Sequence, residues 1–175
     1  VGCNSSSVQV WDAMSQKRLR VLGGHTARVA SLSWNPSHRS VVSSGGRDAL
    51  VLHHDIRSPQ QACATLRGHR QEVCGLKWCP DGSTLASGGN ENYLCLWDFA
   101  MSGRDAEPSE STPRLILSEH KAAVKALAWA PFQRSLLASG GGTADRSIKF
   151  WNSNTGALLN SIDTGSQVCS LLWSP

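Results

Sequence analysis

The sequence lacks an uninterrupted run of eighteen apolar residues, so it contains no candidate transmembrane helix. No secretory signal pattern stands at its start. It also has no Cys-x-x-Cys pair, and its six cysteines mostly stand where strands normally carry apolar residues. This cysteine usage favours reduced, buried thiols in an intracellular protein. Because no long apolar run is present, we expect no membrane partner.

Clustered basic charge is missing as well. Lys and Arg number 17 against 13 Asp and Glu, a net charge of +4, and they are scattered without forming a run. A nucleic-acid-binding protein gathers its basic residues on one face. The sequence therefore predicts no nucleic-acid partner.

Catalytic motifs are absent too. There is no Gly-x-Ser-x-Gly elbow, and the glycine run 140–142 leads into an expected strand without the Lys-Ser or Lys-Thr of a phosphate loop. No His and Cys residues cluster with ligand spacing. We therefore expect no enzyme, no catalytic residue, no cofactor and no metal site.

Tryptophan, by contrast, is frequent, with 7 residues, and it recurs at a fixed spacing. A separation of 44 residues relates three pairs of equivalent positions: His25 and His69, Trp34 and Trp78, and Trp129 and Trp173. A period of about 40 to 45 residues with Gly-His and Trp-Asp markers is typical of WD-repeat blades, each a four-stranded sheet. The sequence thus predicts an all-β WD-repeat propeller.

The repeats divide the chain into blades, whose strands we letter a to d from the propeller axis outward. We expect a partial blade over 1–22 and blades over 23–66, 67–118 and 119–162. The segment 163–175 is expected to begin another blade, with its first strand at 168–173. A polar insertion at 99–113 is expected to be a mobile c–d loop. This is just under four blades, so we expect a fragment of a longer propeller.

Each repeat has a His in the d–a turn, a Ser in strand b and an acidic residue in the b–c turn. Because equivalent positions of a radial array lie apart, these histidines do not converge on an ion. We expect each His to bond within its own blade, since an unpartnered buried polar group costs about 1–3 kcal/mol. The expected structural sets are His25, Ser44 and Asp48; His69, Ser87, Glu91 and Trp97; and His120, Ser139, Asp145 and Trp151.

Two places depart from this pattern. His54 stands where strand c should carry Trp, so the first set lacks its indole. The run 163–166 replaces the Gly-His turn, so the last repeat has no His. Such a loss indicates either drift or a different demand on that loop.

Several segments exceed what any WD repeat requires: 17–20, 28–29 with 31–34, 53–57, 68–78, 123–129, 140–146 and 165–169. Together they resemble the Fizzy family, the co-activators of the anaphase-promoting complex (cyclosome). The resemblance implies a seven-bladed ring and a non-enzymatic, substrate-recognising role in a ubiquitin ligase. It implies as partners the subunits of that complex, degron-bearing substrates such as cyclins, and spindle-checkpoint or inhibitor proteins, in the nucleus and cytoplasm.

In that family a Lys-Glu-Asn degron docks on the rim formed by the d–a and b–c loops. The matching positions are Asn90, Asn92, Thr143 and Gln167. Asparagine amides both donate and accept hydrogen bonds, which suits a peptide ligand. Taken without the family, Asn90 and Asn92 are better interpreted as turn formers.

The alternative interpretation is an unrelated WD-repeat scaffold, such as a reader of histone tails or an assembly module for another complex. A nucleic-acid-binding propeller is disfavoured because the rim loops are rich in Asn, Thr, Gly and Ser.

Overall fold

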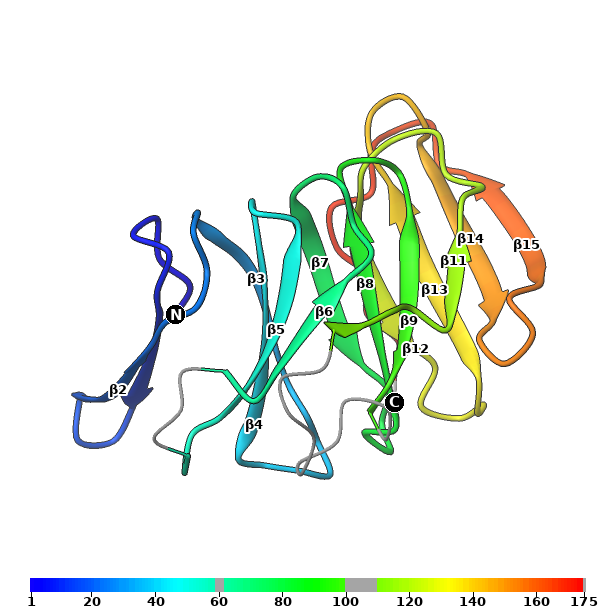
Figure 1. The fold of residues 1–175 in the computed structure, drawn as a ribbon. Helices are drawn as coiled ribbons and strands as arrows, with labels where there is room; N and C mark the ends of the chain where they lie inside the picture. Colours follow the sequence, from blue (N-terminus) through cyan, green and yellow to red (C-terminus); the bar gives the residue numbers. More distant parts are fainter. Residues whose placement is uncertain (59–61, 100–109, 175) are drawn as a thin grey trace.

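The computed structural model describes residues 1–58, 62–99 and 110–174, which form four β-sheets set side by side (Figure 1). No α-helix occurs in these ranges. Within the same ranges, no helix has the length and apolar character needed to cross a membrane. The expected all-β WD-repeat architecture is therefore confirmed.

The first sheet has two strands and the others have at least four. The first sheet is β1 (Val8–Asp12) and β2 (Lys17–Leu22). The second sheet contains β3 (Val29–Trp34), β4 (Val41–Gly46), β5 (Leu50–Asp55) and β6 (Ala64–Arg67). The third contains β7 (Val73–Trp78), β8 (Thr84–Gly89), β9 (Leu94–Asp98) and β11 (Leu115–Leu117). The fourth contains β12 (Val124–Trp129), β13 (Leu136–Gly141), β14 (Ser147–Asn152) and β15 (Leu158–Asp163).

The three larger sheets repeat one another in detail. Consecutive strands pair antiparallel, and the inner strand of each has a register shift near its start, at Val29/Ser31, Val73/Gly75 and Val124/Ala126. A β-bulge of this kind bends a strand and increases its twist. Its recurrence shows that the sequence repeat is also a structural repeat.

The inner strands pack closely enough to require glycine. A Cβ atom placed on Gly75 would lie 2.5 Å from the backbone oxygen of Lys125, and one on Gly88 would overlap the backbone oxygen of Val124. Both contacts cross from the third sheet to the fourth. One apolar cluster accordingly spans these two sheets and includes Leu94 and Leu137. The sheets are thus fixed relative to one another by backbone approach and by a shared core.

Residues 168–173 do not form the expected strand. This segment lies against the fourth sheet, where the Val168 N–H donates to the Gly141 carbonyl (3.0 Å) and the Trp173 indole donates to the Ala128 carbonyl (3.1 Å). It nevertheless forms no regular strand. The physical reason is that a strand needs a continuous backbone ladder, and none of the described strands lies where a ladder partner for this segment would pair.

The insertion at 99–113 also differs from the expectation of a loop without regular structure. A short strand, β10 (Glu110–Ser111), lies parallel to β6, with Ser111 opposite Leu66. The end of the insertion therefore extends the second sheet, although it precedes a strand of the third. The rest of the expected mobile loop, residues 100–109, lies outside the described residues.

The alternation of strand direction separates the loops into two rims. The d–a and b–c loops lie at the upper end of the sheets in Figure 1, and the a–b and c–d loops lie at the lower end. All four residues expected to bind a degron belong to the upper rim.

Candidate functional site

The b–c turns of the upper rim share one backbone feature. The residue that follows the acidic position has a positive φ in each complete sheet: Ala49 at 63°, Asn92 at 72° and Arg146 at 54°. Asn adopts this left-handed region more readily than most residues. The turn conformation therefore accounts for part of the preference for Asn at position 92.

In the third sheet, the expected polar set is brought together around one buried serine. The Ser87 hydroxyl lies 2.7 Å from His69 Nε2 and accepts a bond from the Trp97 indole at 2.8 Å. His69 Nδ1 bonds to the carboxylate of Glu91. Burial is the largest single influence and opposes ionisation of Glu91, but the hydrogen bond and electrostatic attraction of His69, together with backbone hydrogen bonds, outweigh it, so the pKa of Glu91 lies below its usual value. The set is complete, with Glu91 turned into the sheet.

The fourth sheet has the same arrangement. Ser139 Oγ lies 2.6 Å from His120 Nε2 and 2.7 Å from Trp151 Nε1, and His120 Nδ1 lies 2.5 Å from Asp145. Burial lowers the pKa of His120, and the nearby Asp145 carboxylate only partly offsets this. A neutral His120 donates from Nδ1 to Asp145 and accepts from Ser139, which in turn accepts from the indole. Each donor therefore meets an acceptor.

The second sheet corrects one interpretation. His25 bonds to Ser44 (2.9 Å) and Asp48 (3.0 Å) as expected from the sequence, but the set is not missing its fourth member. His54 is buried, and its Nε2 lies 2.9 Å from Ser44 Oγ. The ring N–H that Trp supplies in the other sheets is here supplied by His54. The departure from Trp is thus a replacement within the network.

These bonds also limit the chemistry of the rim histidines. Both ring nitrogens of His25, His69 and His120 are engaged within their own sheets. Among the residues that the structure describes, no group of three or more His, Cys, Asp or Glu side chains is placed to hold a metal ion. The three histidines therefore hold the turns in place.

Two of the four expected ligand-binding residues touch each other. The Thr143 hydroxyl donates to Gln167 Oε1 at 2.8 Å, which joins the b–c turn of the fourth sheet to the segment after β15. The Gln167 amide nitrogen lies 3.2 Å from Cys169 Sγ. Both Thr143 and Gln167 are exposed. They form one exposed polar pair at the upper rim.

Asn90 and Asn92 lie together in the b–c turn of the third sheet. The Asn90 N–H donates to the Glu72 carbonyl (2.9 Å), and the Asn92 N–H donates to the Gly89 carbonyl (3.2 Å). Asn90 is exposed and Asn92 is partly so. Their backbones are fixed, and among the described residues neither side chain is bonded to Thr143 or Gln167. The rim thus offers two separate polar groups from neighbouring sheets.

An ion pair between Arg28 and Glu72 was not anticipated from the sequence. The guanidinium donates from Nε and Nη2 to the two carboxylate oxygens, each at 2.9 Å. Glu72 is almost fully buried, while the Arg28 side chain is about half exposed at 52%. The signal was present, because both residues stand three positions after the repeat histidine and carry opposite charges.

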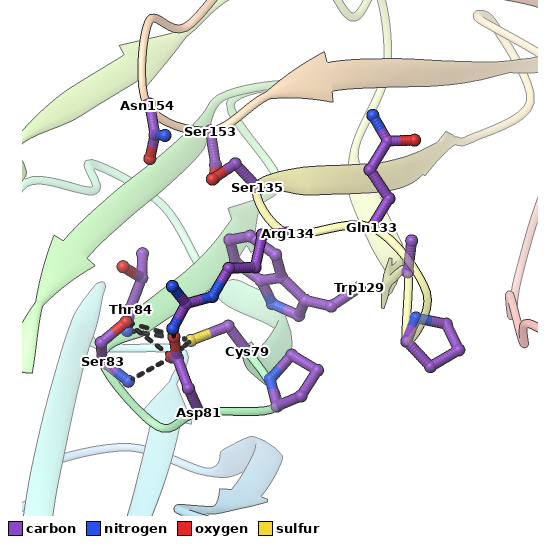
Figure 2. Close-up of a pocket in the computed structure, with 13 residues that line it drawn as sticks. Cys79, Asp81, Ser83, Thr84, Trp129, Gln133, Arg134, Ser135, Ser153 and Asn154 are labelled. Atoms are coloured by element: carbon purple, nitrogen blue, oxygen red, sulfur yellow. Dashed lines mark hydrogen bonds and ion pairs between the residues drawn. The ribbon is translucent and has the colours of Figure 1, made fainter.

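A cavity of about 570 Å³ lies at the other rim (Figure 2). It is formed by the a–b turns of the third and fourth sheets, with the Trp129 side chain and the Asp81–Arg134 ion pair (3.5 Å) on its walls. Hydrogen bonds from Cys79 and Ser83 lower the pKa of Asp81 to about 2. None of the four expected ligand-binding residues lines it, so the cavity is separate from the candidate site.

Repeated four-stranded sheets, each with a His–Ser–acid set joined to a ring N–H, define a WD40-type β-propeller. Within that class, residues 1–175 match the CDC20/Fizzy WD40 domain. The chain therefore belongs to the CDC20/Fizzy family. This confirms the resemblance found in the sequence and sets aside an unrelated WD-repeat scaffold.

Two relatives agree with this family. The chain is 55% identical to "Cell division cycle 20.1, cofactor of APC complex" of Arabidopsis thaliana, over 99% of this chain and 37% of that protein. It is 52% identical to the WD repeat-containing protein srw1 of Schizosaccharomyces pombe, over 99% of this chain and 29% of that protein. The chain thus spans about a third of the length of these relatives.

A solved structure gives the same result. All of this chain superposes on half (50%) of a chain in a crystal structure of the mitotic checkpoint complex, with a TM-score of 0.90 and 49% sequence identity. The fold and the family therefore rest on both sequence and structure.

Proposed function

We propose that this chain is part of a substrate-recognition co-activator of the anaphase-promoting complex, a ubiquitin ligase. The observation that carries the proposal is the match of the whole chain to the CDC20/Fizzy WD40 domain. A relative 55% identical to it is named a cofactor of that complex. Activity and partners of the complete protein are inferred here, because the chain covers only part of its relatives.

The proposed binding surface for a Lys-Glu-Asn degron is the upper rim, through Asn90, Asn92, Thr143 and Gln167. Their side chains carry amide and hydroxyl groups that donate and accept hydrogen bonds, as a peptide backbone and an Asn or Glu side chain require. The b–c turns that hold them are fixed from within, since His69 anchors Glu91 and His120 anchors Asp145. A preorganised polar rim of this kind lowers the entropic cost of binding a short peptide.

The proposed role is recognition without bond chemistry. The rim histidines, which are the usual acid–base groups near neutral pH, are bonded at both nitrogens inside the sheets. The same proposal names degron-bearing substrates such as cyclins, and spindle-checkpoint proteins, as partners, in the nucleus and the cytoplasm. The checkpoint partners are supported by the similarity to a chain of the mitotic checkpoint complex.

A reconstituted ubiquitination reaction tests the proposal. The complete protein is added to purified anaphase-promoting complex, the ubiquitin-charging enzymes and a substrate whose only degron is Lys-Glu-Asn. We expect ubiquitin conjugates that disappear when the motif becomes Ala-Ala-Ala and that fall sharply with the double variant Asn90→Ala/Asn92→Ala.

Asn154→Ala is the matched control, because Asn154 is an exposed asparagine in a turn of the opposite rim. It should leave conjugation unchanged. A complete protein that forms no conjugates would refute the co-activator role. Conjugation that is equally strong with the double variant would refute the assignment of the rim.

A further inference from the structure

The boundary between the second and third sheets is clamped at the upper rim by one charged pair. Arg28 comes from the segment before β3 and Glu72 from the segment before β7, so the pair joins two sheets. Both guanidinium–carboxylate bonds are 2.9 Å, the two-pronged geometry that makes such pairs directional as well as strong. The hydrogen bond to Glu72 raises the pKa of Arg28 above its ordinary value.

Among the described residues, no such pair crosses the upper rim of the next boundary, between the third and fourth sheets. Arg28, Glu72 and Ala123 are equivalent, since each accepts a backbone bond from the b–c turn of its own sheet: from Arg47, Asn90 and Gly142 respectively. Ala123 has no charged group to offer to Glu72. The side-chain clamp is thus specific to the boundary beside Asn90 and is not a general requirement of the repeat.

Glu72 is tied directly to the turn that carries both asparagines. Its backbone carbonyl accepts the Asn90 N–H at 2.9 Å. The neighbouring Gln71 N–H donates to Glu91 Oε2 at 3.1 Å. Two bonds therefore join residues 71–72 to residues 90–91, so we expect a displacement of Glu72 to move Asn90.

We propose that Arg28 is a positioning residue for the degron receptor: by holding Glu72 across the boundary between two sheets, it fixes the backbone from which Asn90 presents its amide to a Lys-Glu-Asn peptide. This inference rests on the function proposed above. Arg28 itself touches no ligand in this account. Arg28 acts by keeping the turn that carries Asn90 at a fixed position relative to the second sheet.

The test measures peptide affinity and amide exchange in the complete protein. Arg28→Ala should weaken a Lys-Glu-Asn peptide by about two- to thirtyfold, the range typical of mutations that act through coupled neighbours. Hydrogen–deuterium exchange at the Asn90 amide should become faster. Arg28→Lys keeps the charge but not the two-pronged geometry, so it should restore part of the affinity.

Arg57→Ala is the matched control. Arg57 makes a comparable two-pronged pair with Asp55, at 3.0 and 2.7 Å, in the turn after β5 at the opposite rim. This variant should leave both peptide affinity and exchange at Asn90 unchanged. The exchanged pair Arg28→Glu/Glu72→Arg should recover affinity relative to Arg28→Ala if the clamp itself is what matters.

The outcomes separate this inference from the proposed function. If Asn92→Ala weakens the peptide and Arg28→Ala does not, the positioning role is overturned while the receptor stands. If neither variant changes affinity and Asn90→Ala is also without effect, the receptor itself is refuted. A lower melting temperature of Arg28→Ala with wild-type affinity assigns the pair to stability alone and also overturns the inference.

Discussion

The second and fourth sheets surround an equivalent buried serine with different rings. In the fourth sheet Ser139 meets His120 and the Trp151 indole, whereas in the second sheet Ser44 meets His25 and the imidazole of His54. Trp offers only an N–H donor, and a His with its proton on Nε2 offers the same donor in the same direction. The comparison teaches that the repeat conserves the hydrogen bond to the serine and tolerates a change of ring.

The replacement has an electrostatic consequence. The second sheet buries two adjacent histidines, and His53 is as deeply buried as His54. Burial, with the neighbouring His54 as a second cause, lowers the pKa of His53 to about 3. In the fourth sheet Lys149 and Phe150 occupy the strand positions before Trp151. The two sheets are thus alike in geometry but differ in how acid affects them.

The largest effect is expected from removing the buried serine at the centre of each network. Ser44→Ala and Ser139→Ala each leave two buried ring nitrogens without a partner, so each should lower the free energy of unfolding by about 2–4 kcal/mol. Denaturant unfolding of the complete protein measures this. The exposed Ser118 provides the control, and Ser118→Ala should be close to neutral. A value for Ser44→Ala as small as the control would show that His54 does not replace the indole.

An effect of similar or smaller size is expected from acidification between pH 6.5 and 4.5. Since the folded pKa of His53 lies below its ordinary 6.5, at about 3, the unfolded chain binds this proton first. The stabilisation is fully present above pH 6.5 and is lost as the pH falls from 6.5 towards 3, by at most about 1.4 kcal/mol per pH unit for one proton. His53→Phe removes this titrating group, so stability should depend less steeply on pH between 6.5 and 4.5 in this variant. The comparison is of the two slopes, so it holds even if the variant is more or less stable than the parent. Equal slopes for parent and variant would contradict the account of His53.

The smallest effect on stability is expected at the rim. Asn92→Ala should change the free energy of unfolding by less than about 1 kcal/mol, because Ala49 adopts nearly the same positive φ at the equivalent turn of the second sheet. Thermal melting of parent and variant measures the difference. A loss of several kcal/mol would mean that the Asn92 side chain holds the turn. Weaker peptide binding by this variant would then no longer indicate a direct contact between Asn92 and the peptide.

The fold was predictable because each repeat is marked by His and Trp residues that occupy the same structural position in each of the larger sheets. The separation of 44 residues between His25 and His69 and between Trp34 and Trp78 reflects equivalent positions in successive sheets. The segment 168–173 was not predictable in the same way. Alternation of apolar residues reports burial on a face, whereas strand structure also needs a neighbouring backbone to pair with.

The candidate site was predictable in its position but not in its contacts. Membership of b–c and d–a loops places Asn90, Asn92, Thr143 and Gln167 on one rim. The Thr143–Gln167 bond depends on loop conformation, which no spacing encodes. His54 was misjudged because the pattern names a residue type, Trp, where the physical requirement is a buried N–H donor.

The central claim is that the upper rim binds a Lys-Glu-Asn peptide through its asparagines. The most direct test is a calorimetric titration of such a peptide into the complete protein, the Asn90→Ala variant and the Asn92→Ala variant. We expect saturable binding to the parent and an affinity lower by about 1–3 kcal/mol in the variants, as for loss of a desolvated hydrogen bond. Unchanged affinity in both variants would contradict the claim.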